Sequence, residues 1–333
     1  MSEILEAPVS GRSAWTQADF AGKDWVCYLD EEDNRDVANA FATLKATGLQ
    51  LGEFSKREFP LQVFSKKLAE QREEIVYGRG FSLLRGLDLS PYSVDELELI
   101  YWGIGTYLGE GIEQNAHGDL LTHVTFHDLD PNNPNVRGYQ DRRHQEPHND
   151  LADIVGLLCV RKAKSGGASS IVSMGSVYNA FLERRPDLLP IMYRGFHLDH
   201  RGEGDNPSST TDFAVPVFAN HDGRLVCFYG RRGIDGAFRK RGVEPSVDEA
   251  EALALMDELI MTPEYRLDMD MQPGDIQFVN NYTVLHARTA YEDYDEPSRW
   301  RLLLRLWLNQ SEAEPPESIG RFTRKGFADF VQR

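Results

Sequence analysis

The sequence predicts an α+β, mainly β fold, with an antiparallel β core of the jelly-roll type and flanking helices. Many short apolar or alternating segments are separated by turn signals, which is typical of antiparallel strands. Helical periodicity is concentrated early in the chain and in insertions. Strands and helices do not alternate regularly, and this argues against a doubly wound parallel sheet.

The first third of the chain predicts helices around one short strand. Residues 33–46 place apolar side chains on one helical face, and Gly48 is the expected stop. A second helical stripe covers 61–75, and 79–85 is typical of a short buried strand. The run 93–96 is a capping box and opens a third helix.

The middle of the chain predicts the rim of a site. Residues 130–147 are polar and rich in Pro and Asn, and loops of this length are usually functional. The run 154–160 is continuously apolar, which indicates a strand covered on both faces. Residues 201–212 are rich in Gly, Ser, Thr and Asp, and we interpret them as a lid. Further strands are expected at 120–128, 169–173, 213–219, 224–229, 275–280, 282–288 and 300–309, and further helices at 176–193 and 246–261.

Composition excludes several classes of protein. The formal net charge is -17 and the pI is about 5.0, without the basic patch that a nucleic-acid binder needs. The three cysteines have the spacing of neither a zinc site nor a disulfide framework. No signal peptide or apolar run of membrane-spanning length is visible. We therefore expect a cytoplasmic protein with a small-molecule partner, and a homo-oligomer is left open.

The strongest chemical signal is the run Glu-Pro-His-Asn-Asp at 146–150. On a strand, His148 and Asp150 point to the same side because side chains alternate. His286 is the best candidate for a third ligand. Two His and one carboxylate form the facial triad of non-haem Fe(II) oxygenases. Taken alone, a His beside an acid is more often a solvated or hydrogen-bonded loop residue.

The segment 299–308 supports a functional reading. Its even positions are Trp or Leu, whereas Arg299, Arg301 and Arg305 lie among apolar residues at odd positions. A buried guanidinium needs a partner. That partner is either an internal Asp or Glu or a dicarboxylate co-substrate, which Arg binds with two parallel hydrogen bonds.

Six segments together resemble the taurine dioxygenase-like (TauD/TfdA) family of Fe(II)- and 2-oxoglutarate-dependent oxygenases. They occur in the family's order at 80–86, 148–150, 165–169, 273–275, 281–288 and 301–305. The resemblance implies one such domain over 1–333. A mostly helical part at 1–77 would pack on a double-stranded β-helix core at 78–310 with insertions.

The resemblance also implies roles for individual residues. His148, Asp150 and His286 would be the iron ligands, and Asn149 departs from the Thr that is common between the first two. Arg301, fifteen residues after the distal His, would hold the far carboxylate of 2-oxoglutarate. Two further residues would lie near the co-substrate: Ser169, where the family often has Thr, and Arg305, which would contact 2-oxoglutarate or an anionic substrate.

The implied reaction consumes O2 and 2-oxoglutarate, releases succinate and CO2, and most often hydroxylates the substrate. Desaturation, ring formation and epimerisation are other outcomes, and a zinc hydrolase or a non-catalytic jelly-roll binding protein are alternatives of other classes. We expect a small carboxylate-bearing or amino-acid-like substrate, with Arg305, His144 and Asn281 as candidate contacts. The alternatives are that Arg305 pairs with an internal acid or with 2-oxoglutarate, that His144 is solvated, and that Asn281 caps the backbone.

Overall fold

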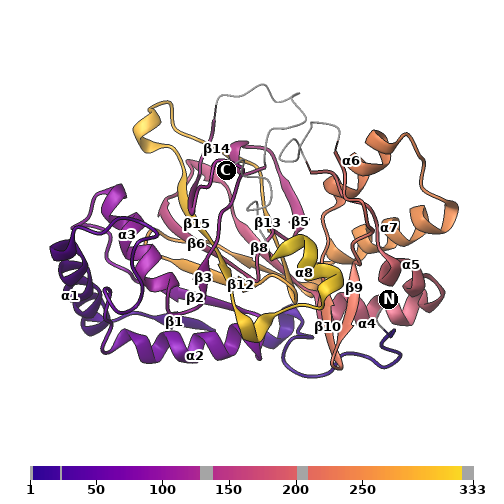
Figure 1. Ribbon diagram of the computed structural model, residues 1–333, viewed down its shortest axis with the longest axis horizontal. Coiled ribbons are helices and arrows are strands. Elements are labelled where there is room, and N and C mark those ends of the chain that lie inside the picture. Colours follow the sequence, from indigo (N-terminus) through magenta and orange to yellow (C-terminus); the bar gives the residue numbers. More distant parts are fainter. Residues whose placement is uncertain (1–2, 23–24, 128–137, 201–208, 325–333) are drawn as a thin grey trace.

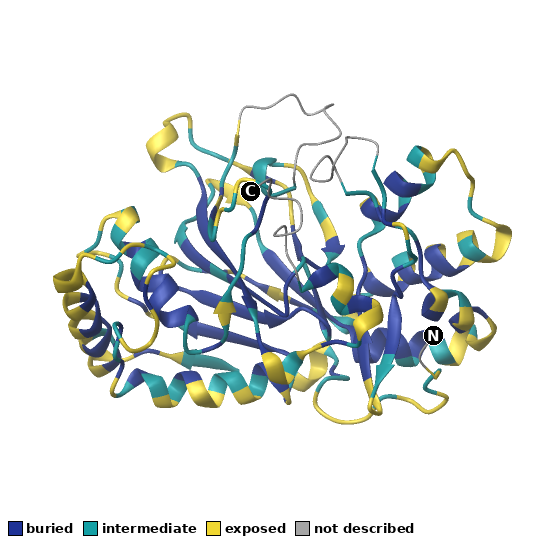
Figure 2. Ribbon diagram, in the orientation of Figure 1, coloured by how far each residue is buried: buried dark blue, intermediate teal, exposed yellow. Residues whose placement is uncertain are grey.

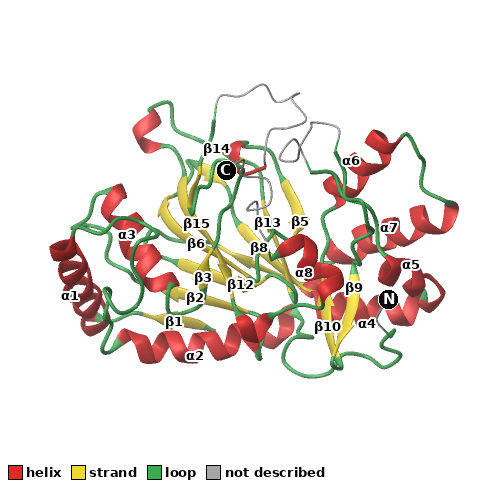
Figure 3. Ribbon diagram, viewed as in Figure 1, coloured by secondary structure: helices red, strands yellow, loops and turns green. Residues whose placement is uncertain are grey.

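The computed structural model describes residues 3–22, 25–127, 138–200 and 209–324. Strands fill its centre, and helices cover two opposite flanks (Figures 1 and 3). The strands are β1 Val26–Tyr28, β2 Phe81–Arg85, β3 Glu110–Gly111, β4 Leu121–Val124, β5 Gln145–His148, β6 Ile154–Arg161, β7 Ser165–Gly166, β8 Ser169–Ser173, β9 Phe218–His221, β10 Arg224–Cys227, β11 Arg266–Met269, β12 Ile276–Asn280, β13 Val284–Arg288, β14 Tyr291–Glu292 and β15 Leu302–Asn309. The helices are α1 Glu31–Thr47, α2 Phe64–Val76, α3 Val94–Gly105, α4 Met174–Arg184, α5 Leu189–Arg194, α6 Arg231–Arg241, α7 Val247–Ile260 and α8 Glu317–Thr323, and short 3-10 turns include Gly138–Gln140 and Pro186–Leu188.

Two sheets make up the β core. The larger has the order β1-β2-β12-β6-β15-β3, with β4 also pairing with β15, and the smaller has the order β11-β8-β13-β5. The β1–β2 pair is parallel, and the other pairs in these two sheets are antiparallel. The chain passes from one sheet to the other between β5 and β6 and again between β12 and β13. The expected mixed α+β fold with a jelly-roll core is therefore confirmed.

Strand β15 shows how the layers are built. Its even-numbered residues, from Leu302 to Leu308, belong to an apolar cluster with helices α1 to α3. Its odd-numbered Leu303 and Trp307 belong to a second cluster, which contains residues of both sheets. The period-two alternation expected at 300–309 is thus present, and Arg301 and Arg305 share the parity of the residues that face the space between the sheets.

The N-terminal helices cover the outer face of the larger sheet, and their outward faces are exposed (Figure 2). The Ser93 side chain caps α3 in a capping box, as expected. Helix α1 begins earlier than the sequence predicted, because Asp30 accepts hydrogen bonds from the backbone N–H groups of Glu32 and Asp33. Gly48 ends it in the left-handed conformation.

Helices α4 to α7 and the β9–β10 hairpin form the opposite flank (Figure 1). The predicted helix 176–193 is divided at Pro186 into α4 and α5, and the Ser246 capping box opens α7 as expected. The hairpin turn is only Asp222–Gly223, and both residues have positive φ, so β9 extends to His221, past its predicted end. At their other ends the strands are shorter than predicted, since β9 begins at Phe218 and β10 ends at Cys227. Helix α6 was not predicted.

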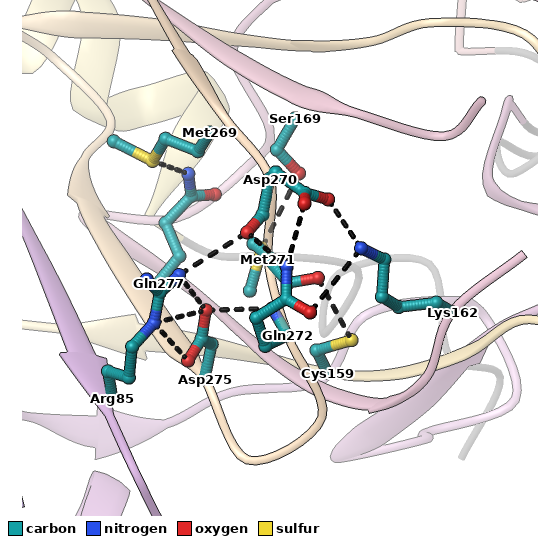
Figure 4. Close-up of polar contacts among 10 residues, drawn as sticks. All are labelled: Arg85, Cys159, Lys162, Ser169, Met269, Asp270, Met271, Gln272, Asp275 and Gln277. Atoms are coloured by element: carbon teal, nitrogen blue, oxygen red, sulfur yellow. Dashed lines mark hydrogen bonds and ion pairs between the residues drawn. The ribbon is translucent and has the colours of Figure 1, made fainter. Parts of the chain in front are cut away.

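Two of the family-like segments meet beside the larger sheet (Figure 4). Arg85 at the end of β2 donates from Nε and Nη2 to the buried carboxylate of Asp275, at 3.0 and 2.6 Å. The same carboxylate accepts from the backbone N–H of Gln272 at 2.8 Å. These bonds hold the turn that leads into β12, so the segments 80–86 and 273–275 position the strand that precedes β13.

Some expectations concern residues outside those described. The proposed lid at 201–212 lies mostly outside them, as does the first part of the 130–147 loop. Within the described ranges, no helix has the length and apolar character needed to cross a membrane.

Candidate active site

Three potential metal ligands converge between the two sheets. His148 at the end of β5 and His286 in β13 are direct partners across the ladder, and their ring centroids are 4.4 Å apart. The Nε2 atoms of both rings lie 3.7 Å from the carboxylate oxygens of Asp150. One ligand atom from each residue fits within 4.8 Å of the others. The expected triad is therefore assembled by pairing of the two His-bearing strands.

The imidazoles are in the form that a metal requires. Nδ1 of His148 lies 2.8 Å from the carbonyl oxygen of Glu146, which can only accept, so Nδ1 carries the proton. The unprotonated Nε2 accepts from the side-chain amide of Gln145 at 3.0 Å. Burial lowers the pKa of His286, so this ring is neutral at neutral pH. Nδ1 of His286 is buried without a hydrogen-bond partner among the described residues. Neutral imidazole is the form that binds metal ions.

Asp150 is held as a carboxylate. Its Oδ2 accepts from Nη1 of Arg305 at 3.0 Å and from the indole Nε1 of Trp307 at 2.9 Å. Burial would raise the pKa of Asp150, but the positive charge of Arg305 and the other donors outweigh it and hold this pKa well below its ordinary range. Arg305 also donates from Nε to Gln114 at 2.8 Å. Arg305 thus pairs with an internal acid, which was one of the two alternatives.

This donor set fits Fe(II). Two imidazole nitrogens from partly buried histidines and one oxygen of the buried Asp150 carboxylate match the facial arrangement found in non-haem iron oxygenases. The same donors also suit zinc, so the donor set alone does not choose between oxygenase and hydrolase.

A second group of buried polar side chains lies farther along the same strands. Arg288 and Arg301 are 5% and 4% exposed, and their guanidinium carbons lie 4.7 and 5.2 Å from the centroid of the Tyr291 ring. Neither arginine forms an ion pair with a described residue, and Nη1 of each is buried without a partner there. Burial, followed by the charge of Arg301, lowers the pKa of Arg288 to about 10. Buried cations of this kind call for an anionic ligand.

Arg288 was missed by the sequence reasoning. It follows His286 by two residues on β13 and therefore faces the same side, about 7 Å along the strand. Nη2 of Arg288 donates to the backbone carbonyls of Asp141 and Arg143, at 2.7 and 2.5 Å. It thereby ties β13 to the segment that precedes His148.

The other expected site residues are placed as follows. Ser169 is buried on β8 opposite Arg288, and its hydroxyl lies 3.5 Å from the sulfur of Met271 (Figure 4). Asn281 is fully buried and bonds to backbone groups, as the capping alternative describes. His144 is 41% exposed, lies near Glu146, and does not line the cavity beside the triad.

That cavity reaches His148 and Asp150 and, with its open mouth, holds about 820 Å³ of space. Arg305 and Trp307 also line it, as do Phe228 and Phe322, whose ring centroids are 5.6 Å apart. Sequence reasoning had identified neither phenylalanine. Tyr139 and Gln145 come from the described part of the 130–147 loop and also line the cavity, which agrees with the interpretation of that loop as a rim.

Comparison with known proteins identifies the class. Residues 44–307 match the model of the taurine catabolism dioxygenase TauD, TfdA family. The chain is 33% identical over 314 residues to FR-33289 synthase of Streptomyces rubellomurinus, covering 93% of this chain and 92% of that protein. It is 30% identical over 315 residues to the taurine hydroxylase-like protein SAT17 of Stachybotrys chartarum, covering 91% and 80%.

Solved structures share the fold. An asparagine oxygenase in complex with Fe(II), 3-hydroxyasparagine and succinate has a TM-score of 0.67 at 16% identity, covering 89% of this chain and 98% of that one. The non-heme iron oxygenase OrfP in complex with Fe and alpha-ketoglutaric acid has a TM-score of 0.63 at 14% identity, covering 85% and 93%. The chain belongs to the TauD/TfdA family and is an Fe(II)- and 2-oxoglutarate-dependent oxygenase.

Proposed function

We propose that this oxygenase hydroxylates a small amino-acid-like or carboxylate-bearing molecule at an iron held by His148, Asp150 and His286. The observation that carries the proposal is the convergence of these three donors beside a cavity that is also lined by Arg305. Family membership gives the class of reaction, and the geometry supports the assignment of the residues.

When bound, iron and 2-oxoglutarate supply the oxidation: one O2 is consumed, succinate and CO2 are released, and a C–H bond of the substrate becomes C–OH. The protein's part is to hold the iron ligands in position and to orient the co-substrate and the substrate. Arg305 and Trp307 keep Asp150 ionised and fix its orientation. Arg301 and Arg288 provide the positive charge that the far carboxylate of 2-oxoglutarate requires, and Ser169 lies opposite Arg288 on the neighbouring strand.

The cavity supports a small polar substrate. Charged groups of both signs line it: Arg305, which is paired with Asp150, and Asp199, which is paired with Lys240. The first turn of α6 contributes Gly230 and Gly233 to the wall, and helix N-termini favour anions. Proteins with this fold include an asparagine oxygenase and an oxygenase in complex with hydroxylated L-Arg.

We also place the enzyme in the cytoplasm. Its three cysteines, Cys27, Cys159 and Cys227, are all free. A reducing compartment keeps such thiols unpaired, and it also keeps iron ferrous.

The test is a screen of amino acids and small organic acids that reads succinate formation by protein loaded anaerobically with Fe(II). We expect O2 uptake that needs both Fe(II) and 2-oxoglutarate, and its loss in His148→Ala and His286→Ala. His123→Ala is the matched control, because His123 is 43% exposed and pairs with Glu98. Hydrolysis supported by zinc without 2-oxoglutarate, or full turnover in either ligand variant, would contradict the proposal.

A further inference from the structure

Asn149 lies between two of the proposed iron ligands and uses every polar atom of its side chain. Its Nδ2 donates to the carbonyls of Asn281 and Val284, at 2.5 and 3.1 Å. Its Oδ1 accepts from the backbone N–H of Tyr229 at 2.7 Å. The side chain is buried, so these bonds do not compete with bulk water.

These bonds link two chain segments that carry ligands. Asn149 belongs to the turn from His148 to Asp150, and Val284 lies on β13 two residues before His286. The amide therefore fixes how far the turn lies from the strand. The ladder pairing of His148 with His286 does not extend to Asp150. Other hydrogen bonds must therefore fix the position of the Asp150 backbone relative to β13.

Asn281 makes the reciprocal connection. Its Oδ1 accepts from the backbone N–H of Asp150 at 3.0 Å, and its Nδ2 donates to the carbonyls of Asp150 and Ala152 at 2.5 and 2.8 Å. Asn149 thus bonds from the segment of His148 and Asp150 to the segment that leads to His286. Asn281 makes bonds in the opposite direction. Together they enclose the backbone of Asp150.

The same side chain reaches the wall of the cavity. The backbone N–H of Asn149 donates to the carbonyl of Tyr229 at 2.9 Å, so Asn149 and Tyr229 exchange two bonds. The neighbours Phe228 and Gly230 both line the cavity. Only an amide suits all these partners, because Asp offers no donor when ionised, and Ser or Thr has a single hydroxyl hydrogen for two carbonyls.

We infer that Asn149 is a positioning residue for the iron site, which sets the place of Asp150 relative to His286 and joins both to the wall of the substrate cavity. The inference rests on the proposed function, because it assumes that these residues bind iron. It concerns the chain's own hydrogen bonds, so it can be tested by metal binding without any substrate.

The experiment compares Asn149→Ala with Asn280→Ala by anaerobic titration with Fe(II) and with Co(II), whose visible spectrum reports coordination geometry. Asn280 is the matched control: it is a buried Asn adjacent to Asn281, but it bonds to the carbonyl of Ile75 and the N–H of Tyr282. We expect Asn149→Ala to raise the Kd for metal about tenfold or more and to change the Co(II) spectrum. Asn280→Ala should bind metal as the wild type does, even though it too loses stability.

Asn149→Asp is measured in parallel, since it keeps the shape and the acceptor for Tyr229 but places carboxylate oxygens against two carbonyls. It also tests the inference if the alanine variant does not fold. A wild-type Kd for metal and a wild-type Co(II) spectrum in Asn149→Ala or Asn149→Asp would overturn the inference. If the wild type itself binds Fe(II) no better than His148→Ala, the proposed function fails instead, so the two failures are distinguishable.

Discussion

Replacing Arg301 by Met should weaken co-substrate binding without destabilising the ligand-free protein. Arg301 is 4% exposed, and its Nη1 has no partner among the described residues. A guanidinium in this position has lost hydration that no carboxylate of the described chain replaces. Replacing buried charges by apolar groups of similar volume is often neutral or stabilising by about 1–4 kcal/mol. We therefore expect ligand-free Arg301→Met to be as stable as the wild type or more stable.

Whereas the stability of Arg301→Met should be unchanged or higher, its affinity for 2-oxoglutarate should be lower. A hydrogen bond between charged groups is worth about 1.5–3 kcal/mol. Loss of one such bond corresponds to a roughly 10- to 150-fold higher Kd for 2-oxoglutarate. Loss of a two-pronged contact would exceed this, because both bonds would end on the same carboxylate.

Two measurements check the prediction: denaturant unfolding of the ligand-free protein, and calorimetric titration of 2-oxoglutarate into protein loaded anaerobically with Fe(II). Arg299→Met is the control, because Arg299 is 53% exposed and pairs with Glu296. A wild-type Kd in Arg301→Met would refute the assigned role. A stability loss of about 3 kcal/mol, as for an ordinary core truncation, would refute the argument about the unpaired charge.

Three further predictions concern the surroundings of the triad. Arg305→Met should cost about 3–5 kcal/mol of unfolding free energy, measured with denaturant, because it leaves the buried carboxylate of Asp150 without its cation. Phe322→Ala should raise KM for whichever substrate the screen finds while leaving the Kd of 2-oxoglutarate unchanged, because Phe322 lines the cavity and Arg301 does not; equal effects on KM and Kd would argue against this. Burial raises the pKa of Asp153 from 3.8 to about 6, so the folded state holds a proton that the unfolded state releases. Unfolding free energy, relative to Asp153→Asn, should therefore fall by about 2 kcal/mol as pH rises from 4 to 6, and parallel pH profiles of the two proteins would contradict this.

The parts of the fold that sequence reasoning found are those specified by local signals. The Ser93 and Ser246 capping boxes mark helix starts through bonds within four residues, and both are present. The alternation in β15 was readable because one face carries an unbroken run of Leu. Helix α6 lacked such a signal. Its buried positions include Gly233 and Gly236, and Gly236 is required because Asp199 packs where a side chain would begin.

The triad could be predicted, but its supporting contacts could not. His148 and Asp150 are neighbours in sequence, whereas the Arg305 that holds Asp150 is 155 positions away. The sequence could identify Arg305 as buried but not choose between an internal acid and a bound anion. The residues of the cavity wall could not be predicted either, because they too come together from distant parts of the chain. Phe322 of α8 meets Phe228 across the fold, and α8 follows the last residue matched by the family model.

Arg288 is different, because a local rule could have found it. The argument that placed His148 and Asp150 on one face was that residues two apart on a strand point the same way. His286 and Arg288 have the same spacing on β13, so a ligand at 286 places the guanidinium at 288 on the ligand's side. Val284 occupies the same face and packs between the sheets, whereas Leu285 packs against the outer helices. The alternation thus places Arg288 on the inner face with His286, the proposed metal ligand, where a charge must have either a carboxylate or an anionic ligand as its partner.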